Sequence, residues 1–210
     1  MAKEAALDAA PPPPGFDEFL QLPSYSEATS KPLRFEIWHG GGLGLKNTDM
    51  TVTTEDPGNV VFYLRCPTSW SGRLDLSLRR GNKDGEEIAK IAREASLSSL
   101  SFEVRMASAG APILVRHLSA WDGKFQWNNG YEELVWLPGK KWRDCYNWSL
   151  SKASEANLPE EQRRIMARWL TPNWERRKSG TLIIQPDHSH EQDLIIATAL
   201  GVGLGGSGQL

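Results

Sequence analysis

The chain has 210 residues with a formal net charge of -2, 40% apolar and 24% charged residues, which are ordinary values for one soluble globular domain with a tail. The near balance of charge gives no indication of nucleic-acid binding. Two cysteines, Cys66 and Cys145, with no secretory leader before them, predict an intracellular, cytoplasmic protein with reduced thiols.

Residues 1–32 are expected to form a proline-rich, disordered tail. The run Pro11–Pro14 favours polyproline II, and residues 1–30 carry one Lys against five acidic residues, a net of -4. Leu22-Pro23-Ser24-Tyr25 matches the (Pro/Leu)-Pro-x-Tyr pattern that WW domains bind, with Leu22, Pro23 and Tyr25 as the contact residues. The tail is therefore either the ligand of a WW-domain partner, such as a ubiquitin ligase, or a linker into the first strand.

From Leu33 onward the chain consists of short β-rich runs, many with alternating apolar and polar residues, as in Leu74, Leu76 and Leu78. Residues that tolerate positive φ separate the runs, in Asn82–Gly85, Asp122–Gly123, Asn128–Gly130 and Pro138–Gly139. Such spacing predicts a sandwich or a barrel. The twelve predicted strands are Leu33–Trp38, Met50–Thr54, Val60–Arg65, Leu74–Arg79, Ile88–Arg93, Ser101–Met106, Ile113–Leu118, Lys124–Trp127, Glu132–Trp136, Trp142–Ser149, Ile165–Leu170 and Gly180–Ile184.

The segment around residues 163–170 supports two interpretations. Pro159–Gln162 has the chemistry of a helix start, and the apolar residues that follow have near-helical spacing. The alternation of Ile165, Ala167 and Trp169 supports a strand almost equally well.

The end of the chain predicts a capped turn, with Asp187 or Ser189 as the N-cap, followed by an apolar helix. No residue from Leu194 to Leu204 is charged. A helix that is apolar all round must be buried on every side, and this one is shorter than the about 20 residues that cross a bilayer. We therefore expect no transmembrane segment and a sheet that closes around the helix.

These elements resemble the tubby C-terminal-like superfamily, which includes tubby domains, phospholipid scramblases and LURP-one-related proteins, and within it small fungal members. The likeness covers roughly residues 33–205, within a predicted barrel domain of residues 33–206, and is carried by Phe125–Trp136, Gly180–Ile184 and Asp193–Leu200. It implies a mainly β fold, a closed antiparallel barrel of about twelve strands around a central apolar C-terminal helix, with the contested segment as a strand. It also implies phosphoinositide binding of the tubby kind or membrane association of the scramblase kind.

Catalytic and metal-binding signatures are weak. His39-Gly40-Gly41-Gly42 resembles an esterase oxyanion loop, but no Gly-x-Ser-x-Gly elbow accompanies it. His188 and His190 lack the further ligands that zinc requires. We therefore expect no catalytic residues, no metal and no cofactor, and a protein that is not an enzyme.

Three basic clusters remain: Arg79-Arg80 with Lys83; Lys140-Lys141 with Arg143; and Arg163, Arg164 and Arg168 with Arg176, Arg177 and Lys178. They are either solvated strand edges or contacts for anionic lipid. Arg79, Arg80 and Lys83 lie at a hairpin end and are the preferred lipid-binding candidates. The sequence thus predicts a binding module that docks peripherally on anionic membrane lipid; the alternatives are a WW-dependent adaptor and a scramblase-like, lipid-moving protein.

Overall fold

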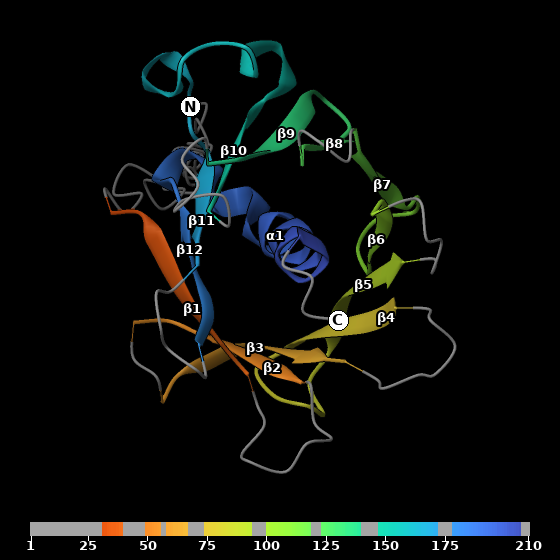
Figure 1. The fold of residues 1–210 in the computed structure, drawn as a ribbon. Coiled ribbons are helices and arrows are strands. Elements are labelled where there is room, and N and C mark those ends of the chain that lie inside the picture. The colour runs from red at the N-terminus through yellow and green to blue at the C-terminus, as the bar shows by residue number, and fades with distance from the viewer. Residues whose placement is uncertain are drawn as a thin grey trace, which may run out of the picture. The chain divides into compact units, whose positions relative to one another are not determined.

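The computed structural model describes residues 31–39, 49–55, 58–66, 74–93, 100–118, 123–139, 147–171 and 178–206. Within these residues, twelve antiparallel strands close into a barrel around a single α-helix (Figure 1). Each strand pairs with its neighbour in the chain, and the first strand closes the barrel by pairing with the last. The predicted fold class is confirmed.

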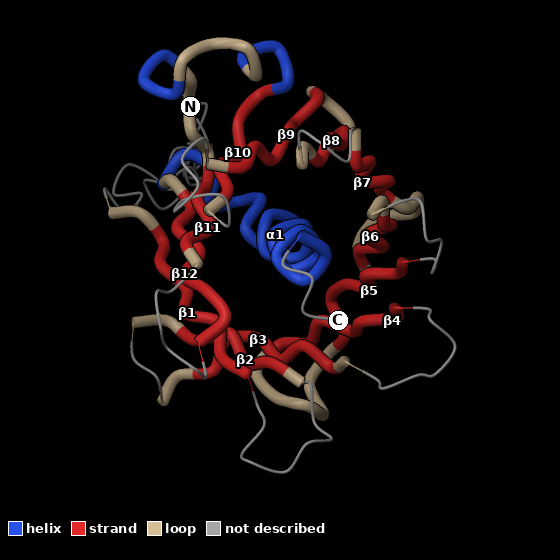
Figure 2. Tube along the Cα trace, viewed as in Figure 1, coloured by secondary structure: helices blue, strands red, loops and turns tan. Residues whose placement is uncertain are grey.

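The strands in chain order are β1 (Leu33–His39), β2 (Met50–Thr53), β3 (Val60–Arg65), β4 (Leu74–Arg80), β5 (Glu87–Arg93), β6 (Phe102–Met106), β7 (Ile113–His117), β8 (Phe125–Asn128), β9 (Glu133–Pro138), β10 (Trp148–Lys152), β11 (Ala167–Leu170) and β12 (Lys178–Ile184). Two short 3₁₀ turns, η4 (Ala153–Glu155) and η5 (Glu160–Gln162), lie outside the ring of strands between β10 and β11 (Figure 2). A third, η6 (Pro186–Glu191), leads into the helix α1 (Gln192–Gly206).

The contested segment divides between its two interpretations. The helix-start chemistry produces only the single turn η5, and the chain then extends into β11. Ala167 and Trp169 face the core, and β11 pairs with β10 on one side and β12 on the other. Backbone pairing on both edges outweighs the local helical signal, because a central strand satisfies its main-chain groups only when extended.

One strand extends beyond its predicted end. The sequence predicted a strand over Trp142–Ser149, of which Trp142–Tyr146 lie outside the described residues, and β10 occupies Trp148–Lys152. Trp148 and Leu150 face inward, and Lys152 still pairs with Leu134 of β9. Pairing with β9 therefore extends the strand beyond the apolar run that marked it in the sequence.

The predicted N-cap of the terminal helix is wrong. Asp187 and Ser189 lie inside η6, which passes directly into α1, and no side chain caps the start of η6. Pro186 occupies the first turn, where its fixed φ and missing N–H suit a helix start. Because proline has no main-chain N–H, one fewer donor at the start of η6 needs a side-chain acceptor.

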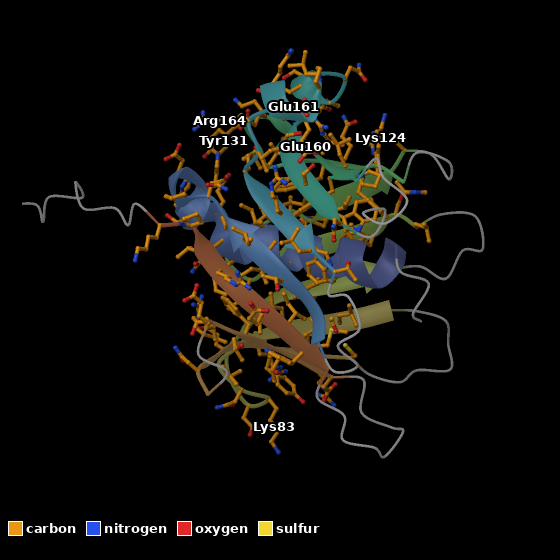
Figure 3. The ribbon with its side chains drawn as sticks, turned by 60° about the vertical axis from the view of Figure 1, so that its left-hand side comes forward. Lys83, Lys124, Tyr131, Glu160, Glu161 and Arg164 are labelled. Carbon is orange, nitrogen blue, oxygen red and sulfur yellow. The ribbon has the colours of Figure 1, made fainter. Side chains whose placement is uncertain are left out.

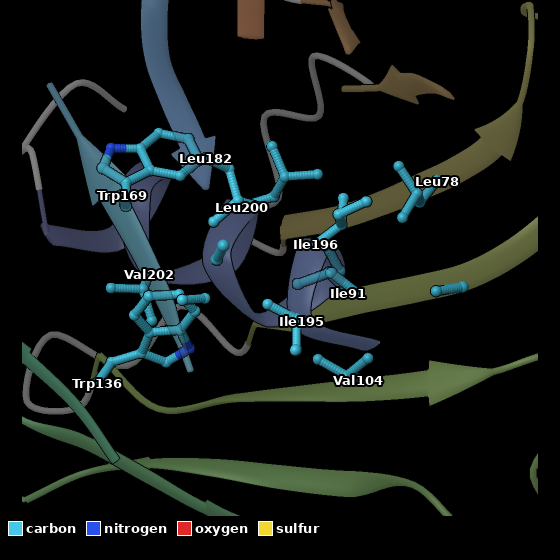
Figure 4. Close-up of a cluster of buried hydrophobic side chains, with 14 of the residues drawn as sticks. Leu78, Ile91, Val104, Trp136, Trp169, Leu182, Ile195, Ile196, Leu200 and Val202 are labelled. Atoms are coloured by element: carbon cyan, nitrogen blue, oxygen red, sulfur yellow. The ribbon is translucent and has the colours of Figure 1, made fainter. Parts of the chain in front are cut away.

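Helix α1 is enclosed by the barrel (Figure 4). Thr198 is the one polar residue between Leu194 and Leu204, and its hydroxyl is paired. The hydroxyl donates to the Ile195 carbonyl at 3.1 Å and accepts from Trp136 Nε1 at 3.2 Å. Among the described residues, no helix is long and apolar enough to span a membrane. The helix residues with at most 1% exposure are Ile195, Ile196, Ala197, Thr198, Ala199, Leu200 and Val202.

Two glycines of α1 allow aromatic rings to approach the helix backbone. A Cβ on Gly201 would lie 2.3 Å from the ring of Phe102, on β6. A Cβ on Gly203 would lie 2.8 Å from the indole of Trp169, and one on Gly180 of β12 would lie 2.7 Å from the same indole. The Trp169 ring thus lies between a glycine of β12 and a glycine of α1. This close packing explains why α1 contains glycines, although glycine lowers the stability of a helix.

Ile195→Asp is expected to unfold the barrel. Ile195 is fully buried, and an unpaired carboxylate there would cost at least about 3 kcal/mol. The conservative Ile195→Val should keep a melting transition near that of the wild type, since such a change costs about 0.5–1.5 kcal/mol. A native-like transition for the aspartate variant would show that the helix is not enclosed.

Gly201→Ala is expected to lower the free energy of unfolding in urea by up to about 2 kcal/mol. Overpacking costs about 1–3 kcal/mol, against a gain in helix propensity of about 1 kcal/mol. The loss should be smaller in a Phe102→Leu background, where the ring that meets the new methyl is gone. An equal loss in both backgrounds would contradict the close approach of Phe102 to Gly201.

Candidate functional site

The predicted lipid-binding residue Arg79 is engaged within the β4–β5 hairpin. Its Nε lies 3.2 Å from Ser77 Oγ, and its Nη1 donates to the carbonyls of Lys83 at 3.3 Å and Gly85 at 3.4 Å. Its Nη2 lies 3.9 Å from Glu87 Oε2. These contacts hold the guanidinium against its own turn.

Arg80, the next residue along the strand, ties the barrel wall to the helix. Its guanidinium lies over the Phe62 ring at 5.7 Å from the centroid. Its Nη2 lies 2.9 Å from Oδ2 of Asp193 in the first turn of α1. Arg80 therefore has a structural role that the sequence pattern did not indicate.

Lys83 is exposed in the turn, at the bottom of the view in Figure 3. The three predicted lipid-binding residues thus do not converge on one point, because side chains of adjacent residues on a strand leave on opposite faces. Residues 79–90 hold four basic and three acidic residues, a net charge of +1, and Asp193 of α1 balances it.

Two further contacts fix the start of the helix. Asn129, in the β8–β9 turn, donates from Nδ2 to Glu191 Oε1 at 2.9 Å. Arg164 Nη2 lies 2.9 Å from Asp187 Oδ2, in η6. His188 Nδ1 lies 3.6 Å from Glu191 Oε2, but the described residues contain no group of three His, Cys, Asp or Glu side chains that could hold a metal. The polar residues before α1 thus attach it to the wall.

A cleft of about 450 Å³ lies on the outer side of β10 and β11, beneath η5. Arg168 Nη2, on its floor, pairs with Glu160 Oε1 at 2.9 Å. Arg163 also lines the cleft; its Nε is buried without a hydrogen-bond partner, and no ion pair involves it in the described part of the chain. Sequence reasoning placed Arg163 in a basic cluster but could not distinguish it from its paired neighbours.

The Cys66 thiol is held in the neutral form. Burial raises its pKa to about 12, and the Asp49 carboxylate adds to the shift. Asp49 itself accepts from the Cys66 main-chain N–H at 2.8 Å and from the Tyr63 hydroxyl at 2.5 Å. A thiol with a raised pKa is a poor nucleophile near neutral pH, so this geometry gives Cys66 no catalytic character.

Several predicted features lie outside the described residues. They include the tail with Leu22, Pro23 and Tyr25, the basic cluster Lys140, Lys141 and Arg143, and the arginines Arg176 and Arg177. Comparisons of the chain with protein-family models, with curated proteins and with solved structures find no match. The resemblance to the tubby superfamily therefore stays a prediction.

Proposed function

We propose that this protein is a non-enzymatic binding module that docks on anionic membrane lipid. The observation that carries the proposal is an uneven distribution of charge. Residues 138–178 hold ten Lys and Arg against five Asp and Glu, a net of +5 in a chain whose total is -2. The implied phosphoinositide binding of tubby-like proteins agrees with this charge.

This basic stretch includes two strands that are neighbours in the barrel. It begins at the end of β9 and continues through β10 and β11, which pair with each other. Arg163 and Arg164 lie between these strands, and Figure 3 shows Arg164 far from Lys83. Of the ten basic residues, Lys152, Arg163, Arg164 and Arg168 have described side chains.

The β10–β11 surface is a better candidate than the β4–β5 hairpin. The hairpin arginines are engaged with the turn and with Asp193, and residues 79–90 carry a net charge of only +1. Arg163, by contrast, has no ion pair within the described chain. That Arg79, Arg80 and Lys83 bind lipid stays a prediction, and one experiment can compare the two surfaces.

Co-sedimentation with phosphatidylcholine vesicles, with and without a phosphoinositide, tests the proposal. We expect wild type to require the phosphoinositide, and Arg163→Ala to weaken binding roughly fivefold, because a basic residue near an anionic surface contributes about 1 kcal/mol. The Arg79, Arg80 and Lys83 to Ala variant should bind nearly as wild type. Arg105→Ala, which removes an exposed arginine paired with Glu103 on β6, is the matched control.

Three outcomes would count against parts of this proposal. Failure of wild type to bind any vesicle would reject lipid docking. Full binding by Arg163→Ala, with a normal melting transition, would reject the β10–β11 surface. Loss of binding only in the hairpin variant would instead locate the site at Arg79, Arg80 and Lys83.

The tail motif supports a second candidate function, recruitment of a WW-domain partner. Leu22-Pro23-Ser24-Tyr25 has the required spacing. Binding to an isolated WW domain, measured by calorimetry, should be lost on Tyr25→Ala and on deletion of residues 1–32, while vesicle binding is unchanged. Equal WW binding by wild type and Tyr25→Ala would rule out the motif.

A further inference from the structure

Strands β7 and β8 pair over only part of their length. Their register includes Arg116 with Gln126 and His117 with Phe125, and no further pair. Beyond these pairs β7 continues along β6 as far as Ile113, and β8 continues along β9 as far as Asn128. The pairing of β7 with β8 therefore ends at Arg116 and Gln126, before the β6–β7 and β8–β9 turns.

The hydrogen-bonding pattern shows which main-chain groups of β7 and β8 face each other. Leu118 N–H donates to the Lys124 carbonyl at 2.9 Å. In an antiparallel ladder every second residue directs its N–H and C=O to the same neighbour, so Leu114 on β7 and Asn128 on β8 point toward each other. The register of the two strands ends before this pair.

A cleft of about 530 Å³ occupies this place and is lined by both strands. Leu114 is 44% exposed and Leu118 is 50% exposed. Arg116 lies between them on the same outward face, is exposed, and has no ion pair within the described residues. The opposite wall contains Glu133, whose Oε2 accepts from Gln126 Nε2 at 2.9 Å.

We propose that this cleft binds an extended peptide of a partner protein that carries an acidic residue with an apolar residue two positions before it and two after it. The side chains on one face of an extended peptide lie about 6.6 Å apart, which matches the spacing of Leu114, Arg116 and Leu118 along their strand. Its carboxylate pairs with Arg116, and its apolar side chains cover the two leucines.

The opposite wall sets the direction in which the acidic side chain points. Glu133 repels a carboxylate on its side of the cleft, so the acid is directed to β7.

The test uses ¹⁵N-labelled full-length protein and a panel of blocked peptides of the form Ser-Φ-Thr-Asp-Thr-Φ-Ser, with Leu, Ile or Phe at Φ. We expect amide shifts at Leu114, Arg116 and Leu118 on titration to about 1 mM, which is the affinity of a weak peptide site. Arg116→Glu should weaken binding about tenfold and strengthen binding of the panel in which Lys replaces Asp by a similar factor. Arg105→Glu, the same charge change on β6, should leave both panels unchanged.

Absence of shifts at these amides with every peptide would overturn the proposal. Equal binding of the Asp and Lys panels by wild type would also overturn it, because Arg116 would then not select the acid. If Arg116→Glu instead abolishes binding to phosphatidylcholine vesicles while no peptide binds, the exposed leucines contact a membrane and the peptide proposal is wrong.

Discussion

The enclosure of α1 is the constraint on which the rest of the structure depends. A helix that is apolar on every side gains stability only when apolar surface surrounds it completely. A sheet can provide this only by closing on itself, which also removes the exposed edges of β1 and β12. Close contact then requires small residues on the helix opposite large rings on the wall, as with Gly201 and Phe102 or Gly203 and Trp169.

The polar residues around the helix start have a second role in the same arrangement. Arg80, Asn129 and Arg164, from three separate parts of the barrel, each contact an acidic residue of η6 or α1. Exposed pairs of this kind contribute little to stability, about 0–1 kcal/mol each. Their effect is to fix the rotation and depth of a helix whose apolar surface has no preferred face. Some of the basic residues in the chain are thereby committed to structure.

The sequence predicted most of the fold, because alternation and turn residues are local signals and an uncharged apolar helix is conspicuous. It could not predict properties that depend on neighbours. The bounds of β10 follow from pairing with β9, and the strand at Ala167–Leu170 is held on both edges by other strands. Likewise, the sequence shows Arg79, Arg80 and Arg163 as similar basic residues. Only the packing separates the Arg80 that holds Asp193 from the Arg163 that has no ion pair in the described chain.

The described part of the barrel offers sites for binding on its outer face. The buried side chains of the strands form one core with α1. On the outer face, two clefts contain arginines that have no ion pair within the described residues, Arg163 beside β10 and β11 and Arg116 on β7. The two clefts differ in their surroundings. Arg163 belongs to a part of the sequence with a net positive charge, whereas exposed leucines flank Arg116. One barrel can therefore present an electrostatic surface for lipid and a separate, more apolar surface for a peptide, because neither depends on opening the core.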